Sequence, residues 1–189
     1  MTYKQAATAK ASEAALKKDP ENRLWWKMST RRLDAEQIRD AILSATGKLD
    51  LKAGGPSADP KEPRRTVYTK VRRNTRDPLL DVFDSPEAFT STAQRNVTTT
   101  PTQALLMFNS PFLLAQAKAL ADRLEKEKNA DFADRAFRLV LGRAIRADER
   151  TQVEAFLREQ TERAGGQRRA ALVDFCHVML NANEFLYVD

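Results

Sequence analysis

Cysteine and histidine are almost absent from this chain, and their scarcity excludes several kinds of site. The single cysteine, Cys176, permits neither an intrachain disulfide nor a cysteine zinc cluster. The single histidine, His177, argues against a histidine-based metal site or catalytic triad. A c-type haem site needs Cys-x-x-Cys-His, but position 173 is Val173. We therefore expect no cofactor in this chain, with Cys176 in the core and His177 at a helix flank.

Long hydrophobic runs are missing as well. No stretch of about 18 apolar residues is present, so we expect no membrane span. The first residues contain no apolar segment of the kind found in a signal peptide. The chain has 189 residues, of which 42% are hydrophobic, and this suffices for a core without crosslinks. We predict one helical domain over residues 1–189.

Acidic residues are absent from one stretch that holds many basic ones. Six cations lie between positions 64 and 76, which equals the net charge of +6 of the whole chain. Such a segment can bind phosphate, an acidic glycan or nucleic acid. Only one aromatic residue, Tyr68, lies within it, so the interleaved stacking of single-strand binders is absent. Two structural explanations of the basic segment remain as alternatives to ligand binding: it forms a charged edge strand, or its arginines pair with distant acids.

The most strongly encoded local structure spans residues 95–112. Thr100 is a good N-cap, Pro101 suits the first helical position, and Gln103 completes a capping box. An Asn109-Ser110 corner then leads into the next helix. Capping and apolar periodicity predict further helices throughout the chain. We expect helices or helical turns over residues 3–18, 20–28, 34–46, 78–83, 100–109, 111–128, 131–140, 147–163 and 168–181.

One segment favours a strand. Residues 66–71 are rich in β-branched side chains, with Val67, Thr69 and Val71 on one side. Such a strand needs a partner, and residues 48–51 are a candidate. The predicted fold is therefore mainly α: an irregular multi-helix domain with one short strand or hairpin near residues 48–72 and a basic loop–strand segment over 52–77.

Two further groups could carry chemistry. Asp77, Asp81 and Asp84 would share a face if residues 78–83 are helical, and paired carboxylates at about 5–10 Å catalyse glycoside hydrolysis. The alternative is a solvated acidic face beside the arginines. Trp25 and Trp26 could stack on sugar rings, or serve as core or interface anchors.

Several long motifs occur in order: "NRLWWKMSTRRLDAEQIRDAIL" from Asn22, "RRTVYTKVRRN" from Arg64, "LLDVFDSP" from Leu79, "RNVTTTPTQALLMFNSPF" from Arg95, and "NANEFLYVD" at the end. Together they resemble the C-terminal domain of unknown function of large secreted planctomycete cytochrome-associated proteins, over residues 2–189. Residues 2–5 resemble an interior motif of that family, so the resemblance implies a C-terminal fragment of a larger domain.

The resemblance implies an extracytoplasmic, non-catalytic scaffold or binding module, linked to polysaccharide breakdown or surface redox work. Its expected partners are the missing N-terminal part, other domains of the parent protein, and glycans. A glycan-acting enzyme and a binder of polyanions or nucleic acid remain the alternatives, although nucleic acid is the less expected partner. Motif residues expected to form a polar binding surface are Arg72, Arg73, Asn74, Asp84, Arg95, Thr100, Gln103 and Asn109.

Overall fold

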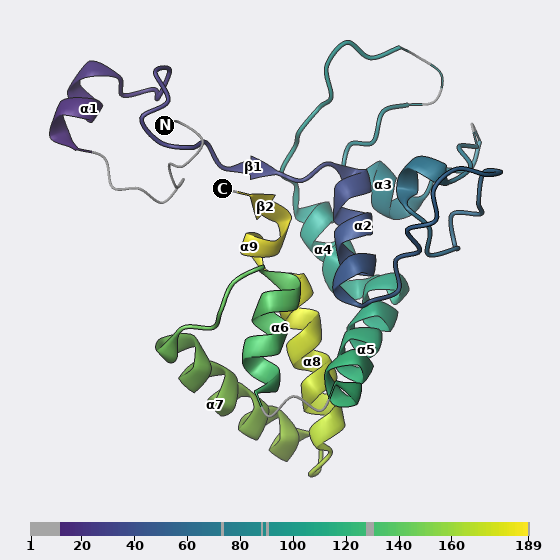
Figure 1. Cartoon of the computed structure of the whole chain (residues 1–189), viewed down its shortest axis with the longest axis vertical. Coiled ribbons are helices and arrows are strands. Elements are labelled where there is room, and N and C mark those ends of the chain that lie inside the picture. The colour runs from purple at the N-terminus through teal and green to yellow at the C-terminus, as the bar shows by residue number, and fades with distance from the viewer. Residues whose placement is uncertain (1–11, 73, 88, 90, 128–130, 189) are drawn as a thin grey trace.

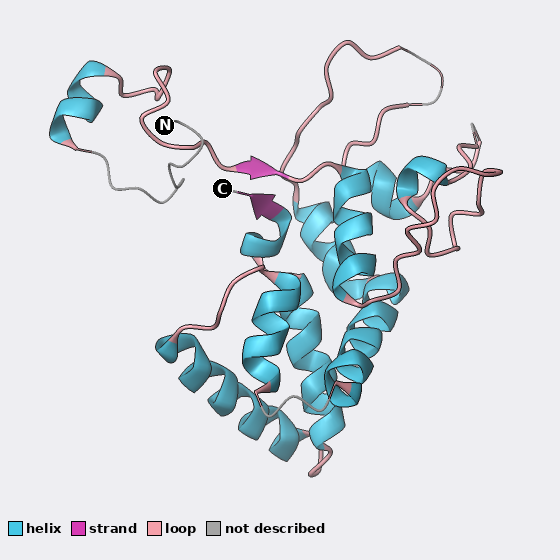
Figure 2. Cartoon of the chain, viewed as in Figure 1, coloured by secondary structure: helices cyan, strands magenta, loops and turns pink. Residues whose placement is uncertain are grey.

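The structure is a computed structural model that describes residues 12–72, 74–87, 89, 91–127 and 131–188. Its helices are α1 (Glu13–Lys18), α2 (Ala35–Ala45), α3 (Pro78–Val82), α4 (Pro101–Asn109), α5 (Pro111–Lys126), α6 (Phe132–Val140), α7 (Ala147–Arg163), α8 (Arg168–Leu180) and α9 (Asn183–Leu186), with a 3-10 helix, η2 (Thr66–Tyr68). Strands β1 (Arg31–Arg32) and β2 (Tyr187–Val188) complete the described elements. The mainly α class is thus confirmed (Figures 1 and 2).

The lower half of the molecule is a helical bundle. Helices α5, α6, α7 and α8 lie together, and α8 makes the most extensive contacts, with α5 and α7 (Figure 1). The buried face of α5 follows the predicted spacing of apolar residues. It consists of Leu113, Ala117, Leu120, Ala121 and Leu124, all nearly inaccessible to solvent. The predicted helix over residues 111–128 is therefore confirmed, and its apolar stripe faces the core.

The upper half contains the short helices α2, α3 and α4 and the long loop between α2 and α3 (Figure 1). Helix α2 begins at a capping box, in which the backbone N–H of Asp34 donates to Gln37 Oε1 at 2.9 Å. Gly47, with φ 71°, follows its last turn, as expected for a C-terminal glycine. The capping box of Thr100 and Gln103 is also present at the start of α4.

The last residues of the chain dock between the two halves. Phe185 on α9 is buried in the core, and β2 pairs antiparallel with β1, so that Arg32 lies opposite Tyr187. The backbone N–H of Leu33 also donates to Leu186 O at 2.8 Å. This pairing joins residues about 155 positions apart in sequence and docks the apolar end of the chain against β1 (Figure 2).

The predicted strand over residues 66–71 is wrong. Its first half forms η2, while Thr69 and Ala58 form only an isolated bridge. The reason is a tertiary contact: both the backbone N–H and the hydroxyl of Thr66 donate to Asp40 Oδ1 on α2, at 2.8 and 2.6 Å. Val67 and Val71 are 70% and 80% exposed, so they form no apolar face. The suggested partner, residues 48–51, forms an isolated bridge from Asp50 to Arg64, which precedes the predicted strand.

The predicted helix over residues 20–28 is also wrong. Asn22 and Trp25 adopt positive φ values of 55° and 58°, which an α-helix does not allow. The carboxylate of Asp19 instead accepts hydrogen bonds from the backbone N–H groups of Arg23 and Leu24. These residues therefore form turns rather than a helix. Of the first predicted helix, residues 3–11 lie outside the described part, and α1 covers the rest.

Candidate functional site

A buried arginine holds the upper half together. Arg32 on β1 is only 4% exposed, and its guanidinium donates to the carbonyl of Thr98, to the carbonyl of Phe83 at 3.3 Å and to Asp84 Oδ2 at 2.8 Å. Asp84 in turn accepts from the backbone N–H and the hydroxyl of Thr98, both at 2.8 Å. The charged pair is therefore satisfied mainly by groups of the fold itself.

Gln103 on α4 extends this cluster. Its Nε2 donates to the carbonyls of Val82 and Thr98 at 3.0 and 3.1 Å, and its Oε1 accepts from the backbone N–H of Thr100 at 3.3 Å. We call Arg32, Asp84, Thr98 and Gln103 the Arg32 network. It connects β1, the end of α3, the segment before α4, and α4.

The electrostatics of the network favour the ionised form of Asp84. Burial of the carboxyl group opposes ionisation, but the hydrogen bonds from Thr98 and Arg32 outweigh it and hold the pKa of Asp84 below its usual range. Asp84 adopts φ 62°, a conformation that aspartate tolerates better than most residues. The residue is therefore charged at neutral pH and serves as a structural acceptor.

A second group of polar residues lines a cleft of about 290 Å³ between α2, α3 and the segment 69–77. We call it the basic cleft. Five cations and three acids face it, which leaves an excess of positive charge. The cations are Arg39, Lys70, Arg72, Arg76 and Arg95, and the acids are Glu36, Asp77 and Asp81.

Three of these cations are engaged by the fold. Arg39 is buried and donates to four groups of the segment 60–66, including the carbonyls of Pro60 and Glu62 at 2.8 Å. Arg95 binds Glu36 through two hydrogen bonds of 2.6 and 2.9 Å, which lower the pKa of that carboxyl group. The third, Arg76, pairs with Asp81 at 2.5 Å. These residues shape the wall of the cleft.

The other two cations have spare binding capacity. Within the described residues, Lys70 has no acidic partner at ion-pair distance. Arg72 lies 3.7 Å from Asp59, and both side chains are about half exposed. An exposed pair of this length contributes little binding energy. Lys70 and Arg72 are therefore available to an anionic ligand.

The first arginines of the basic segment have structural roles instead. The side chain of Arg64 donates to the carbonyls of Lys52, Gly54 and Pro56 and stacks over the ring of Tyr68 at 4.8 Å. It thereby holds the loop before η2 in shape. Arg65 lies 3.6 Å from Asp40 on α2. Arg65 thus pairs with a distant acid, as one of the structural alternatives expected, whereas Arg64 is held by backbone carbonyls.

The residues expected to form a binding surface lie at separate places. Arg72 and Arg95 line the basic cleft, whereas Asp84, Thr100 and Gln103 belong to or adjoin the Arg32 network. Asn109 and Asn74 belong to neither: Asn109 donates to Leu105 O at the end of α4, and Asn74 is exposed in the turn between positions 72 and 75. Arg73 lies outside the described residues.

The three aspartates do not share a helical face. Helix α3 spans only Pro78–Val82, so Asp77 precedes it and Asp84 follows it with positive φ. Asp77 is the N-cap and accepts from the N–H groups of Leu79 and Leu80, while Asp81 pairs with Arg76. Each carboxylate therefore has its own structural partner within the fold.

The two tryptophans have different surroundings. Trp26 donates through its indole N–H to the carbonyl of Asp19 at 2.9 Å, and Lys27 lies over its ring at 5.1 Å. Trp25 is 50% exposed. The indole hydrogen bond anchors Trp26 within the turns of residues 19–29, which leaves Trp25 as the more accessible ring.

Cys176 lies in the core, as predicted. Burial raises the pKa of its thiol to about 12, which keeps it protonated and unreactive. His177 was expected at a helix flank, but it is buried against α4, where its Nε2 lies 3.3 Å from Met107 O and its ring 5.4 Å from that of Phe108. Among the described residues no cluster of three metal-ligating side chains is found.

Sequence patterns had no means of finding several of these residues. Arg32 belongs to a two-residue strand, for which no periodicity exists, and Arg39 lies on the apolar face of α2.

In the described part, no single helix is long and apolar enough to span a membrane. The bent pair α4 and α5, at 53°, meets that criterion only jointly, and α5 packs into the core.

Comparisons with known proteins give one match. A family model described as "PSD1: Protein of unknown function (DUF1553)" matches residues 1–157. Comparisons with curated proteins and with solved structures find no match. The match covers the Arg32 network and the whole basic cleft, and it ends within α7.

Proposed function

The chain belongs to the PSD1 family of proteins of unknown function (DUF1553), and from this premise we propose that it is a non-catalytic binding module whose ligand is an anionic glycan. The proposed binding surface is the basic cleft. The residues that bind are Lys70 and Arg72, supported by Arg95, which also lines the cleft.

One observation carries the proposal: the basic cleft has an excess of positive charge that the fold does not use. Arg39, Arg76 and Arg95 are held by carbonyls or carboxylates, so their positions are fixed before a ligand arrives. Lys70 faces the same cleft with no acid at ion-pair distance in the described part, and Arg72 faces it with a half-exposed contact of 3.7 Å to Asp59. Fixed walls with free cations are what a site for carboxylated or sulfated sugars requires.

A glycan fits this cleft better than nucleic acid does. Binding of single strands relies on aromatic side chains on which successive bases stack. Tyr68, the aromatic residue of the basic segment, is stacked by Arg64 and does not line the cleft. Anionic sugars need cations and hydrogen-bond donors, and Thr69, Thr75 and Ser85 add hydroxyl groups to the lining.

We further propose that the chain works as part of a larger extracytoplasmic protein of the planctomycete type, linked to polysaccharide breakdown or surface redox work. The long motifs that resemble such proteins support this setting. In that setting the Arg32 network serves as the scaffold, since it fixes α3 and α4 relative to the paired strands β1 and β2.

Binding of polygalacturonate, measured by calorimetry at several salt concentrations, tests the proposal. We expect binding that weakens as salt increases, because the contacts are charged. The double variant K70Q/R72Q should bind at least about fivefold more weakly, since each lost ion pair contributes up to about 1 kcal/mol. The control variant R158Q/R163Q removes two exposed cations from α7 and should bind like the wild type.

Three results would overturn the proposal. They are the absence of binding, an equal loss of affinity in both double variants, and tighter binding of a single-stranded DNA oligomer than of polygalacturonate through the same residues. Neutral dextran should not bind, because it lacks the anionic groups that the cleft is proposed to hold.

A further inference from the structure

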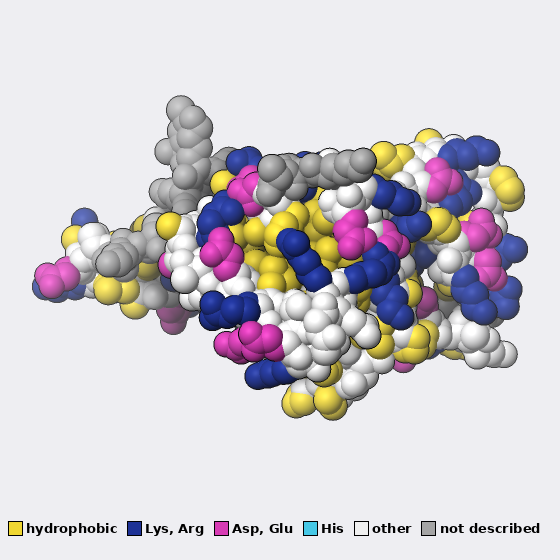
Figure 3. All heavy atoms as spheres, turned by 90° about the horizontal axis from the view of Figure 1, so that it is seen from below, with side chains coloured by type: hydrophobic (Ala, Val, Ile, Leu, Met, Phe, Trp, Pro, Cys, Tyr) yellow, Lys and Arg dark blue, Asp and Glu magenta, His cyan; other side chains and the backbone are white. Residues whose placement is uncertain are grey.

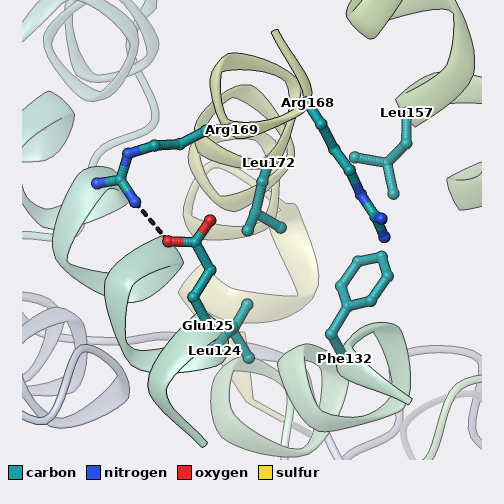
Figure 4. A pocket seen from close by; sticks show the side chains of 7 residues that line it. All are labelled: Leu124, Glu125, Phe132, Leu157, Arg168, Arg169 and Leu172. Atoms are coloured by element: carbon teal, nitrogen blue, oxygen red, sulfur yellow. Dashed lines mark hydrogen bonds and ion pairs between the residues drawn. The ribbon is translucent and has the colours of Figure 1, made fainter. Parts of the chain in front are cut away.

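A second cavity lies at the lower end of the bundle, far from the basic cleft in sequence. It has a volume of about 320 Å³ and opens between the end of α5, the start of α6, α7 and the N-terminus of α8. We call it the lower pocket (Figure 4). Its lining consists of Leu124, Glu125, Phe132, Leu157, Arg168, Arg169 and Leu172.

The floor and walls of the lower pocket are apolar. Leu124 is 2% exposed and belongs to the core, while Phe132, Leu157 and Leu172 are half-buried and pack at its edge. Figure 4 shows Leu124, Leu172 and Phe132 pointing toward one common space. Seen from below, the molecule has a hydrophobic hollow framed by charged side chains (Figure 3). Half-buried leucines around a hollow lack van der Waals contacts on one side, and an apolar ligand would supply them.

The charge at the mouth is positive and comes from two neighbouring arginines with different partners. Arg169 is held by Glu125 and by Asp122, the latter at 2.5 Å. Arg168, in contrast, has no carboxylate partner in the described part of the chain. Its guanidinium carbon lies 6.0 Å from the centre of the Phe132 ring, so the charge lies at the Phe132 side of the pocket (Figure 4).

We propose that the lower pocket binds a small carboxylate with an aliphatic chain, such as a medium-chain fatty acid. The chain would lie on the leucines and Phe132, and its carboxylate would pair with Arg168. The volume is about twice the 150 Å³ of a cavity that holds benzene, and it lies at the small end of ligand pockets. This site does not involve Lys70 or Arg72 and is independent of the glycan proposal.

Calorimetry with the whole chain and three ten-carbon probes tests the assignment. Decanoate should bind, decanol should bind about fivefold more weakly because it lacks the ion pair, and decyltrimethylammonium should bind least. All probes are used below their critical micelle concentrations. The preference for decanoate should shrink at high salt, since the pair lies at the surface.

Two variants test separately the contact with the ligand's carboxylate and the contact with its aliphatic chain. R168Q should weaken decanoate about fivefold and leave decanol unchanged, whereas L172W should fill the pocket and abolish both. R163Q, which changes an exposed arginine at the end of α7, is the matched control and should bind as the wild type does. Thermal unfolding of each variant confirms that it is folded, and R168Q alters only an exposed side chain.

The assignment is overturned if decanoate fails to bind, if decanol binds as tightly, or if R168Q and R163Q behave alike. Binding of phosphatidylglycerol vesicles without binding of free decanoate would also contradict it, because the proposal concerns a single small molecule.

Discussion

At the scale of single residues, Arg32 and Asp84 are the most consequential pair in the chain. Their side chains are 3% and 16% exposed. Arg32 donates a hydrogen bond to the end of α3, and Asp84 accepts one from the segment before α4. A buried pair contributes little relative to an apolar substitute, but removing one partner leaves the other charge uncompensated. The pair therefore fixes the arrangement of the elements around it.

The first prediction is that D84N lowers the free energy of unfolding by about 3 kcal/mol, because Arg32 loses its counter-charge in a buried site. Urea denaturation measures this. D81N is the matched control, since it removes an exposed pair with Arg76 and should cost less than about 1 kcal/mol. Equal midpoints for the two variants would refute the structural role of Asp84.

The second prediction concerns Thr100, which caps α4. T100A should destabilise the protein by about 1 kcal/mol, since it removes the hydroxyl of the capping box. Thr102 lies in the first turn of the same helix and its side chain is exposed, so the control variant T102A should change the stability little. A change of only a few tenths of a kcal/mol in T100A would show that the cap contributes nothing.

At the scale of elements, capping was read from the sequence more reliably than strand pairing was. Asp34, Thr100 and Asp131 cap helices where expected, because the signal lies within four residues of chain. The strand at 66–71 failed because Asp40 and Arg39, more than 25 positions away, bind Thr66 and bend the segment. Propensity cannot register such a contact, and the pairing of β1 with β2 across the whole chain has no local signature.

The third prediction concerns the link between α7 and α9. Arg143 binds Glu149 and Glu184, and its hydrogen bonds lower the pKa of Glu149 to about 2. An unfolded glutamate has a pKa of about 4.3, so this contribution to stability is present above that pH and is lost as pH falls toward 2. E149Q should therefore be less stable than the wild type at pH 7, and the difference should shrink between about pH 4 and pH 2.

Thermal unfolding across this pH range gives the difference directly. E159Q is the control, because Glu159 contacts only Arg163, at 3.9 Å on an exposed surface. The difference in stability between E159Q and the wild type should be small at every pH. A constant difference for E149Q would mean that Arg143 does not stabilise the ionised form.

At the scale of the whole molecule, the two halves differ in how much of them the sequence could predict. The bundle of α5 to α8 follows apolar periodicity, and its helices begin and end close to the predicted positions. The basic cleft was predicted only in part: Arg72 and Arg95 were singled out, but Arg39 was not, since a buried arginine has no pattern of its own. Binding surfaces assembled from distant loops cannot be read from local spacing.

The fourth prediction follows from an exposed apolar surface on α4. Leu105 and Phe108 are each 62% exposed. The net charge of +6 keeps copies apart at low salt, and screening removes this repulsion over about 8–10 Å. Self-association, measured by light scattering, should therefore increase with salt and decrease in L105S/F108S. The control L24S/L51S removes two leucines elsewhere that are even more exposed, and an equal decrease there would contradict a role for α4.

The central claim, that the basic cleft binds an anionic glycan, is tested most directly by two-dimensional NMR of the amide groups during titration with trigalacturonate. We predict saturable shifts for residues that line the cleft, above all Lys70, Arg72 and Arg95, with the amides of α7 and α8 unchanged. Shifts confined to the helical bundle, or no shifts at millimolar ligand, would contradict the claim.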